Sequence, residues 1–204
     1  MKLVVGFGNP GARYAGTRHN VGFRIVDQLA RERGVELSEK RFSGRFGIGR
    51  VGDDELALLE PQTFMNRSGA AVGQAVEGLG IAQLGRDLLL VFDDIDLPLG
   101  RIRVRGAGSA GGHRGLADAI EVLGTSEFAR LRFGVGRPAG GSAAALHVLD
   151  VFTPDEELVV RDRVAVAVRT IESVFADGIR EAMNRYNGPP PEAPLPGAPE
   201  PEET

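Results

Sequence analysis

Four short segments of the chain carry polar side chains that could act together on a substrate, and each follows an apolar run. In chain order they contain Asn9, Tyr14 and His19; Phe64, Met65 and Asn66; Asp93; and His113 with Arg114. A histidine can take up and return a proton near neutral pH, and a carboxylate can fix its tautomer and stabilise its cation. Amide groups can donate hydrogen bonds to a developing oxyanion. These residue types are suited to general-base chemistry, which needs neither a covalent nucleophile nor a metal.

Other interpretations of the same segments stay open at this point. His19 could be an ordinary solvated histidine in a turn. The segment 6–11 (GFGNPG) spells a dinucleotide-binding pattern, although its proline and the lack of a helix at its third glycine argue against that function. The carboxylates of segment 93–96 (DDID) could hold Mg²⁺ instead of orienting a histidine. His147 stands apart from the other motifs, so we interpret it as structural.

The hydropathy pattern alternates between strands and helices. We expect strands at 2–7, 45–51, 55–61, 87–92, 100–105 and 130–135, and helices from about 19 to 33, from about 66 to 80, and at 116–123, 143–149 and 154–185. This alternation predicts an α/β protein with helices on both faces of the sheet. The most apolar run, 87–92, is expected in the centre of the sheet. In an open α/β sheet the carboxyl ends of the strands meet in one crevice, so the four segments should gather there.

Charge is unevenly distributed along the 204 residues. The Pro-rich segment 188–204 holds four of the 28 acids and none of the 24 bases, so the rest of the chain is neutral. Such a composition predicts a disordered tail. Seven arginines, among them Arg105 and Arg132, lie between Arg101 and Arg137, against three acids. Guanidinium groups match phosphate, so this stretch is a candidate nucleic-acid contact; a solvated strand face is the alternative.

Two features narrow the class of protein. The chain has no cysteine, so disulfides and thiolate metal sites are excluded. No apolar run approaches the length of a membrane span, and no charged-then-apolar leader begins the sequence. We therefore expect a cytoplasmic protein that makes no membrane contact and uses no cofactor or metal.

Five motifs that occur in order resemble those of the bacterial-type peptidyl-tRNA hydrolases. They are GFGNPGARYAGTRHNVGF, PQTFMNRSG, DDIDLPLGRIRVR, GSAGGHRGL and RLRFGVGRP. The resemblance implies a single α/β domain at 1–187, with a twisted, mixed and mostly parallel sheet of the phosphorylase/hydrolase-like kind. It also implies hydrolysis of the ester that joins a peptide to the 3′ ribose of tRNA. Peptidyl-tRNA is then the expected partner, and a monomer is the expected state.

The same resemblance implies roles for individual residues. His19 would be the catalytic base and Asp93 the carboxylate that supports it. Asn9 would recognise the acylated amino group, so that aminoacyl-tRNA with a free amino group is rejected. The remaining expected substrate and tRNA contacts are Tyr14, Phe64, Met65, Asn66, His113 and Arg114, together with Arg105 and Arg132 on the tRNA phosphates.

One position departs from the family pattern. The family usually reads Gly-Gly-His-Asn-Gly in the glycine-rich loop, whereas here Arg114 follows His113. A role for an amide at this position is therefore not carried over, although a guanidinium group could still donate to a carbonyl or phosphate oxygen. A protein that binds RNA on the same scaffold without catalysis is the alternative. The presence of His19 and Asp93 together with two asparagines argues against it.

Overall fold

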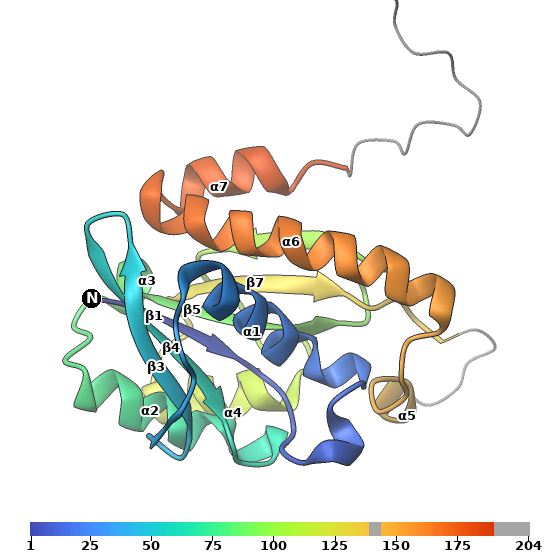
Figure 1. Ribbon diagram of the computed structural model, residues 1–204, viewed down its shortest axis with the longest axis horizontal. Helices are drawn as coiled ribbons and strands as arrows, with labels where there is room; N and C mark the ends of the chain where they lie inside the picture. The colour runs from blue at the N-terminus through green and yellow to red at the C-terminus, as the bar shows by residue number, and fades with distance from the viewer. Residues whose placement is uncertain (139–143, 190–204) are drawn as a thin grey trace, which may run out of the picture.

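A seven-stranded sheet with helices on both faces forms the body of the protein in a computed structural model that describes residues 1–138 and 144–189 (Figure 1). The strands are β1 (Lys2–Gly6), β2 (Glu39–Arg41), β3 (Gly44–Val51), β4 (Asp54–Pro61), β5 (Leu88–Asp94), β6 (Ile102–Arg105) and β7 (Ala129–Gly134). The α-helices are α1 (Val21–Arg33), α2 (Ser68–Gly78), α3 (Leu84–Asp87), α4 (Arg114–Leu123), α5 (Ala144–His147), α6 (Pro154–Ala176) and α7 (Ile179–Tyr186). The 3₁₀ helices are η1 (Ala12–Tyr14), η2 (Arg18–Asn20) and η3 (Met65–Arg67). The predicted α/β class is confirmed.

The strand order is β2-β3-β4-β1-β5-β7-β6. β4, β1, β5 and β7 are parallel neighbours, whereas β2-β3, β3-β4 and β7-β6 pair antiparallel. The sheet is therefore mixed, and parallel in its centre. Every residue of β5 is buried, as predicted for an interior strand. Because β4, β1 and β5 run in the same direction, the segments that follow them emerge at one edge of the sheet.

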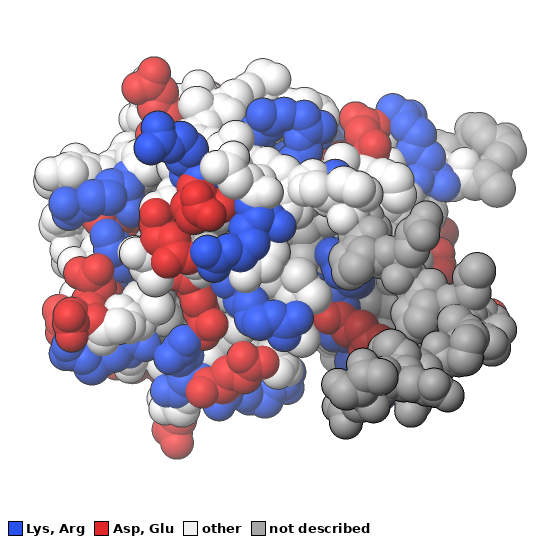
Figure 2. All heavy atoms as spheres, turned by 90° about the horizontal axis from the view of Figure 1, so that it is seen from above, with Lys and Arg blue, Asp and Glu red and all other residues white. Residues whose placement is uncertain are grey.

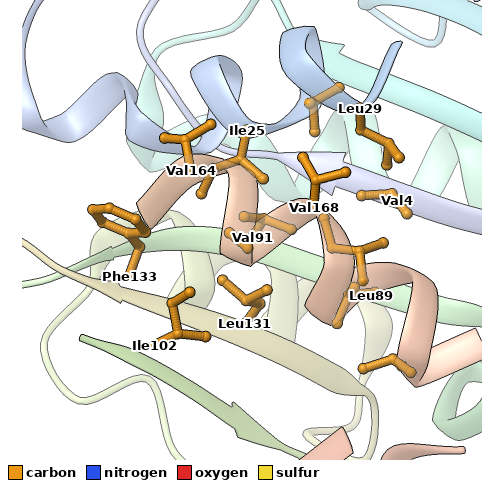
Figure 3. Packing of buried hydrophobic residues seen from close by; sticks show 14 of the residues in the cluster. Val4, Ile25, Leu29, Leu89, Val91, Ile102, Leu131, Phe133, Val164 and Val168 are labelled. Atoms are coloured by element: carbon orange, nitrogen blue, oxygen red, sulfur yellow. The ribbon is translucent and has the colours of Figure 1, made fainter. Parts of the chain in front are cut away.

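Two apolar layers sandwich the sheet, because successive side chains of a strand point to opposite faces. On one face, α1 and α6 cover a cluster that includes Val4, Val91 and Leu131 (Figure 3). On the other face, α2 and α4 cover a cluster that includes Leu3 and Leu90. The two layers hold the strand ends rigidly, which is what a catalytic site at those ends requires.

The helices near the C-terminus differ from the prediction. The helix expected at 154–185 is two helices, α6 and α7, separated at Gly178, whose φ of 89° ends helical geometry. The helix expected at 143–149 is the shorter α5, and residue 143 lies outside the described residues. The expectation of a disordered tail also falls largely on residues that are not described, 190–204. The short elements β2 and α3 were not predicted.

Two glycines allow α1 to begin directly against the sheet. A Cβ on Gly22 would lie 2.4 Å from the carbonyl oxygen of Phe7 and 2.5 Å from that of Val91. A Cβ on Gly6 would lie 2.4 Å from the carbonyl oxygen of Gly22. Both positions therefore require glycine, and the resulting contact brings the residues that precede α1 to the carboxyl ends of β1 and β5.

On the side away from β7, the edge strand β6 is hydrogen-bonded by the side chain of Asn187. Asn187 accepts a hydrogen bond from the backbone N–H of Val104 at 2.7 Å and donates one to its carbonyl oxygen at 3.0 Å. The carbonyl oxygen of Asn187 in turn accepts from Arg101. The end of α7 is thereby tied to the outermost strand of the sheet.

Over the face formed by α6 and α7, basic and acidic side chains are interspersed rather than grouped by sign (Figure 2). Such mixing is typical of a solvated surface. None of the helices in the described parts of the chain is both long and apolar enough to cross a bilayer.

Candidate functional site

His19 and Asp93 meet where η2 lies against the end of β5. The Nδ1 atom of His19 is 2.7 Å from Oδ1 of Asp93. The His19 side chain is 13% exposed and the Asp93 side chain only 2%, so the imidazole separates the carboxylate from solvent. Because the carboxylate accepts from Nδ1–H, the other ring nitrogen, Nε2, remains free to accept a proton.

A second imidazole contacts the same oxygen of Asp93. Nε2 of His113 lies 3.2 Å from Oδ1, and the two imidazole rings are 5.2 Å apart between centroids. Burial alone would raise the pKa of Asp93, but the charge of His19 and the hydrogen bonds from His113 and His19 outweigh it and hold this pKa well below its usual range. Asp93 is therefore a carboxylate anion at neutral pH.

Asn9 is fixed by residues of η2 and η3. Its side-chain oxygen accepts from the backbone N–H of Met65 at 2.9 Å. The side chain of Asn20 hydrogen-bonds both backbone groups of Asn9. Its amide oxygen accepts from the N–H of Asn9 at 2.8 Å, and its NH₂ donates to the carbonyl oxygen of Asn9 at 2.9 Å. With the Asn9 oxygen engaged, its amide NH₂ is oriented as a donor.

These groups line a cleft of about 930 Å³ at the carboxyl ends of the central strands. All the sequence-predicted site residues lie along it: Asn9, Tyr14, His19, Phe64, Met65, Asn66, Asp93, Arg105, His113, Arg114 and Arg132. Met65 is buried, whereas Phe64 is 58% exposed and offers its ring to the cleft. Residues more than a hundred positions apart thus share one concave surface, as expected from the strand ends.

The arginines of β6 and β7 extend the cleft along one face of the sheet. Ile102 and Val104 of β6 point into the core, so Arg103 and Arg105 point to the opposite face. Arg132 pairs with Arg103 in the ladder and makes an ion pair with Asp94. Arg101 precedes β6 and donates a hydrogen bond to the carbonyl oxygen of Asn187.

Arg18 was not predicted, although it supports the segment that carries His19. It is 5% exposed, and its guanidinium group bonds Glu156 at 2.6 Å and the carbonyl oxygen of Val151 at 2.6 Å. The backbone N–H of His19 donates to the carbonyl oxygen of Val148 at 2.8 Å. The connection between α5 and α6 therefore fixes η2. The Thr-x-x-Glu spacing at 153–156 signals the capping box that positions Glu156, but nothing in the sequence signals its partner.

Arg130 was also missed as a part of the site. It is 2% exposed, and its guanidinium group donates to the carbonyl oxygens of Gly108 and Ser126, both at 2.5 Å. It thereby ties the glycine-rich loop to β7. His147, which we interpreted as structural, contacts the carbonyl oxygen of Val135 at 3.3 Å and does not join the His19 cluster.

The described residues do not support the two alternative ligands, a dinucleotide at segment 6–11 and Mg²⁺ at segment 93–96. Segment 6–11 leads into the 3₁₀ helix η1, and α1 begins only at Val21, so no helix N-terminus faces a pyrophosphate. Asp93, Asp94 and Asp96 contact different partners, namely the two histidines, Arg132 and Arg137. These three carboxylates therefore do not converge on a common ion.

A different trio could hold a metal ion. The ligand atoms of His19, Asp93 and His113 lie within 4.8 Å of one another. However, Nδ1 of His113 accepts a hydrogen bond from the N–H of Leu116 at 3.1 Å. A neutral imidazole that binds a metal through Nε2 carries its proton on Nδ1, where it would oppose that N–H. The cluster is therefore better suited to hydrogen bonding than to coordination.

The fold and the site together define an α/β protein with a histidine–aspartate pair in a partly basic cleft. The family model for peptidyl-tRNA hydrolase matches residues 3–194. The chain belongs to the peptidyl-tRNA hydrolase family.

Individual relatives agree with this assignment. The chain is 48% identical to the peptidyl-tRNA hydrolase of Synechococcus sp. (strain JA-3-3Ab), over 92% of this chain and 83% of the relative. It is 45% identical to the peptidyl-tRNA hydrolase of Halalkalibacterium halodurans, over 92% of this chain and all of the relative. Among solved structures, it is similar to the peptidyl-tRNA hydrolase from Acinetobacter baumannii, with a TM-score of 0.85 and 35% identity over 92% of this chain and 94% of the other.

Proposed function

We propose that this protein hydrolyses the ester bond between a peptide and the 3′ ribose of tRNA, and thereby returns tRNA to use. The observation that carries the proposal is the 2.7 Å contact between His19 and Asp93 in the cleft, on a chain of this family. It supports a base whose free nitrogen, Nε2, is presented to a water molecule.

The reaction follows from the chemistry of the groups in the cleft. Nε2 of His19 removes a proton from water, and the hydroxide attacks the ester carbonyl. Asp93 stabilises the imidazolium that forms. The amides of Asn9 and Asn66 donate to the oxyanion of the tetrahedral intermediate, which then collapses. The 3′ hydroxyl of tRNA leaves with the proton held by His19. General-base assistance contributes about 10²–10⁴-fold, and one oxyanion donor contributes about 10²–10³-fold.

Five of the predicted residues are assigned as substrate contacts in the same proposal. The exposed ring of Phe64 and the side chain of Tyr14 accommodate the tRNA end and the last residue of the peptide. Arg105 and Arg132 contact tRNA phosphates, since they lie on the open face of the outer strands. The amide of Asn9 also discriminates in favour of an acylated amino group.

We further propose that the protein works as a cytoplasmic monomer. Every residue that we assign to the site comes from one chain, so the cleft is complete without a second copy. Its proposed substrate is a cytoplasmic RNA. Sedimentation of the protein alone and with tRNA tests whether it is a monomer.

The test is release of an N-acetylated amino acid from charged tRNA. The wild type should release it, and His19→Ala should reduce kcat by about 10²–10⁴-fold because the base is lost. His147→Ala is the matched control, since this histidine lies outside the cluster, and it should keep full activity. Equal release by His19→Ala and the wild type would refute the assignment of the base. A wild type that binds tRNA but releases nothing would support the RNA-binding alternative.

A further inference from the structure

The carboxylate of Asp93 is held from two sides by two histidines. His19, in η2, approaches Oδ1 at 2.7 Å, and His113, which precedes α4, approaches the same atom at 3.2 Å. Each imidazole must present an N–H to this oxygen, because a carboxylate anion only accepts hydrogen bonds. No other charged side chain contacts Asp93 among the described residues.

The tautomer of His113 is fixed by the helix that it precedes. His113 is the N-cap residue of α4, and its Nδ1 accepts from the backbone N–H of Leu116 at 3.1 Å. A neutral imidazole has one acceptor nitrogen and one donor nitrogen, so the proton of His113 resides on Nε2. That is the nitrogen that faces Asp93. The cap of α4 and the hydrogen bond to Asp93 therefore require the same protonation state.

The surroundings of His113 direct it toward Asp93 rather than toward a substrate. Its side chain is 9% exposed, less than that of His19. The ring stacks on Phe7 at 5.9 Å between centroids, with 19° between the ring planes, and contacts Phe92 at 4.7 Å. These contacts on the ring faces leave the imidazole little freedom to rotate.

We propose that His113 is a positioning residue for hydrolysis. It holds Asp93 in the orientation in which that carboxylate meets His19, and it does not itself bind the substrate. This inference rests on the proposed function and changes the role that the family resemblance suggested for His113. It also links the N-terminus of α4 to the catalytic pair, because one ring serves both.

The test separates the cap from the contact with Asp93. His113→Asn keeps a side-chain oxygen that caps α4, since asparagine is among the best N-cap residues, but it is too short to replace the Nε2–H. His113→Ala removes both functions. For each variant, kcat and KM for an N-acetyl-aminoacyl-tRNA are measured between pH 5 and 9, together with the Tm.

His113→Asn should lower kcat by about 10- to 100-fold, the size expected for one hydrogen bond to a charged group, with KM and Tm unchanged. His113→Ala should show the same kcat with a lower Tm. In an Asp93→Asn background, His113→Asn should change kcat by less than about twofold, since the partner is already absent.

Three results would overturn the inference. In the first, kcat of His113→Asn equals that of the wild type across pH 5 to 9, which would make His113 a cap only. In the second, KM rises while kcat is kept, which would make it a substrate contact. In the third, the effects of His113→Asn and Asp93→Asn are fully additive. A wild type that releases no amino acid would refute the proposed function and this inference together, whereas the three results above refute the inference alone.

Discussion

Glu60 is a buried acid outside the site whose protonation should control stability. It lies at the end of β4 and is fully buried, 2.7 Å from the guanidinium group of Arg45, which also lies 3.5 Å from Asp27. Burial, with Asp27 as the next contribution, raises the pKa of Glu60 from its ordinary 4.5 to about 8. The folded protein therefore binds this proton more tightly than the unfolded chain does.

The sign of the pH dependence follows from that difference. The stabilising contribution of protonated Glu60 is complete below pH 4.5 and is lost as the pH rises to about 8. At 1.36 kcal/mol per pH unit, this group lowers the free energy of unfolding by on the order of 5 kcal/mol across that range. Glu60→Gln keeps the shape of the side chain and removes the titration. The variant should match the wild type near pH 4.5 and be several kcal/mol more stable at pH 8.5.

Urea unfolding of both proteins at pH 4.5, 6.5 and 8.5 measures this difference, with the slope m checked for constancy. Glu55→Gln, at an exposed position of the same strand, is the matched control and should leave the pH dependence of the wild type unchanged. If the wild-type and Glu60→Gln stabilities ran parallel from pH 4.5 to 8.5, Glu60 would not titrate in this range and the reasoning would be wrong.

Two further predictions concern the cleft. Arg105→Glu should weaken tRNA binding and reduce the slope of log K against log salt by about 1 to 2. The same change at Arg161, which is exposed on α6, should alter neither the affinity nor the slope. An unchanged slope for Arg105→Glu would place the RNA contact elsewhere. Gly115→Ala should lower kcat about tenfold and the free energy of unfolding by about 1–3 kcal/mol, because its Cβ would lie 2.6 Å from the Met65 sulfur and 3.2 Å from the His113 ring. Wild-type kinetics and urea midpoint in that variant would contradict the tight packing.

The location of the site could be predicted from the sequence because polar residues follow apolar strands. Asn66 closely follows β4, Asp93 lies at the end of β5, and His19 follows β1 after a turn. Parallel strands bring such positions to one edge of a sheet. The partners within the site could not be predicted in the same way. Arg18 and Glu156 are separated by 138 positions, and only tertiary packing brings the turn that carries His19 against the start of α6.

The errors in the fold also have physical causes. Apolar residues continue with helical spacing across Gly178, from Phe175 to Ile179 and Met183, so periodicity alone conceals the break between α6 and α7. β2 is short and entirely exposed, and therefore has no buried face to generate an alternating pattern.

The amide of Asn187 occupies, on the rim of the sheet, the place that a neighbouring strand from another molecule would need. An unprotected edge strand can pair with the edge strand of another copy, which is the first step toward fibres. With both backbone groups of Val104 already satisfied, an approaching strand would have to displace this residue before it could add to the sheet. One asparagine after α7 thus protects this edge of the sheet at Val104.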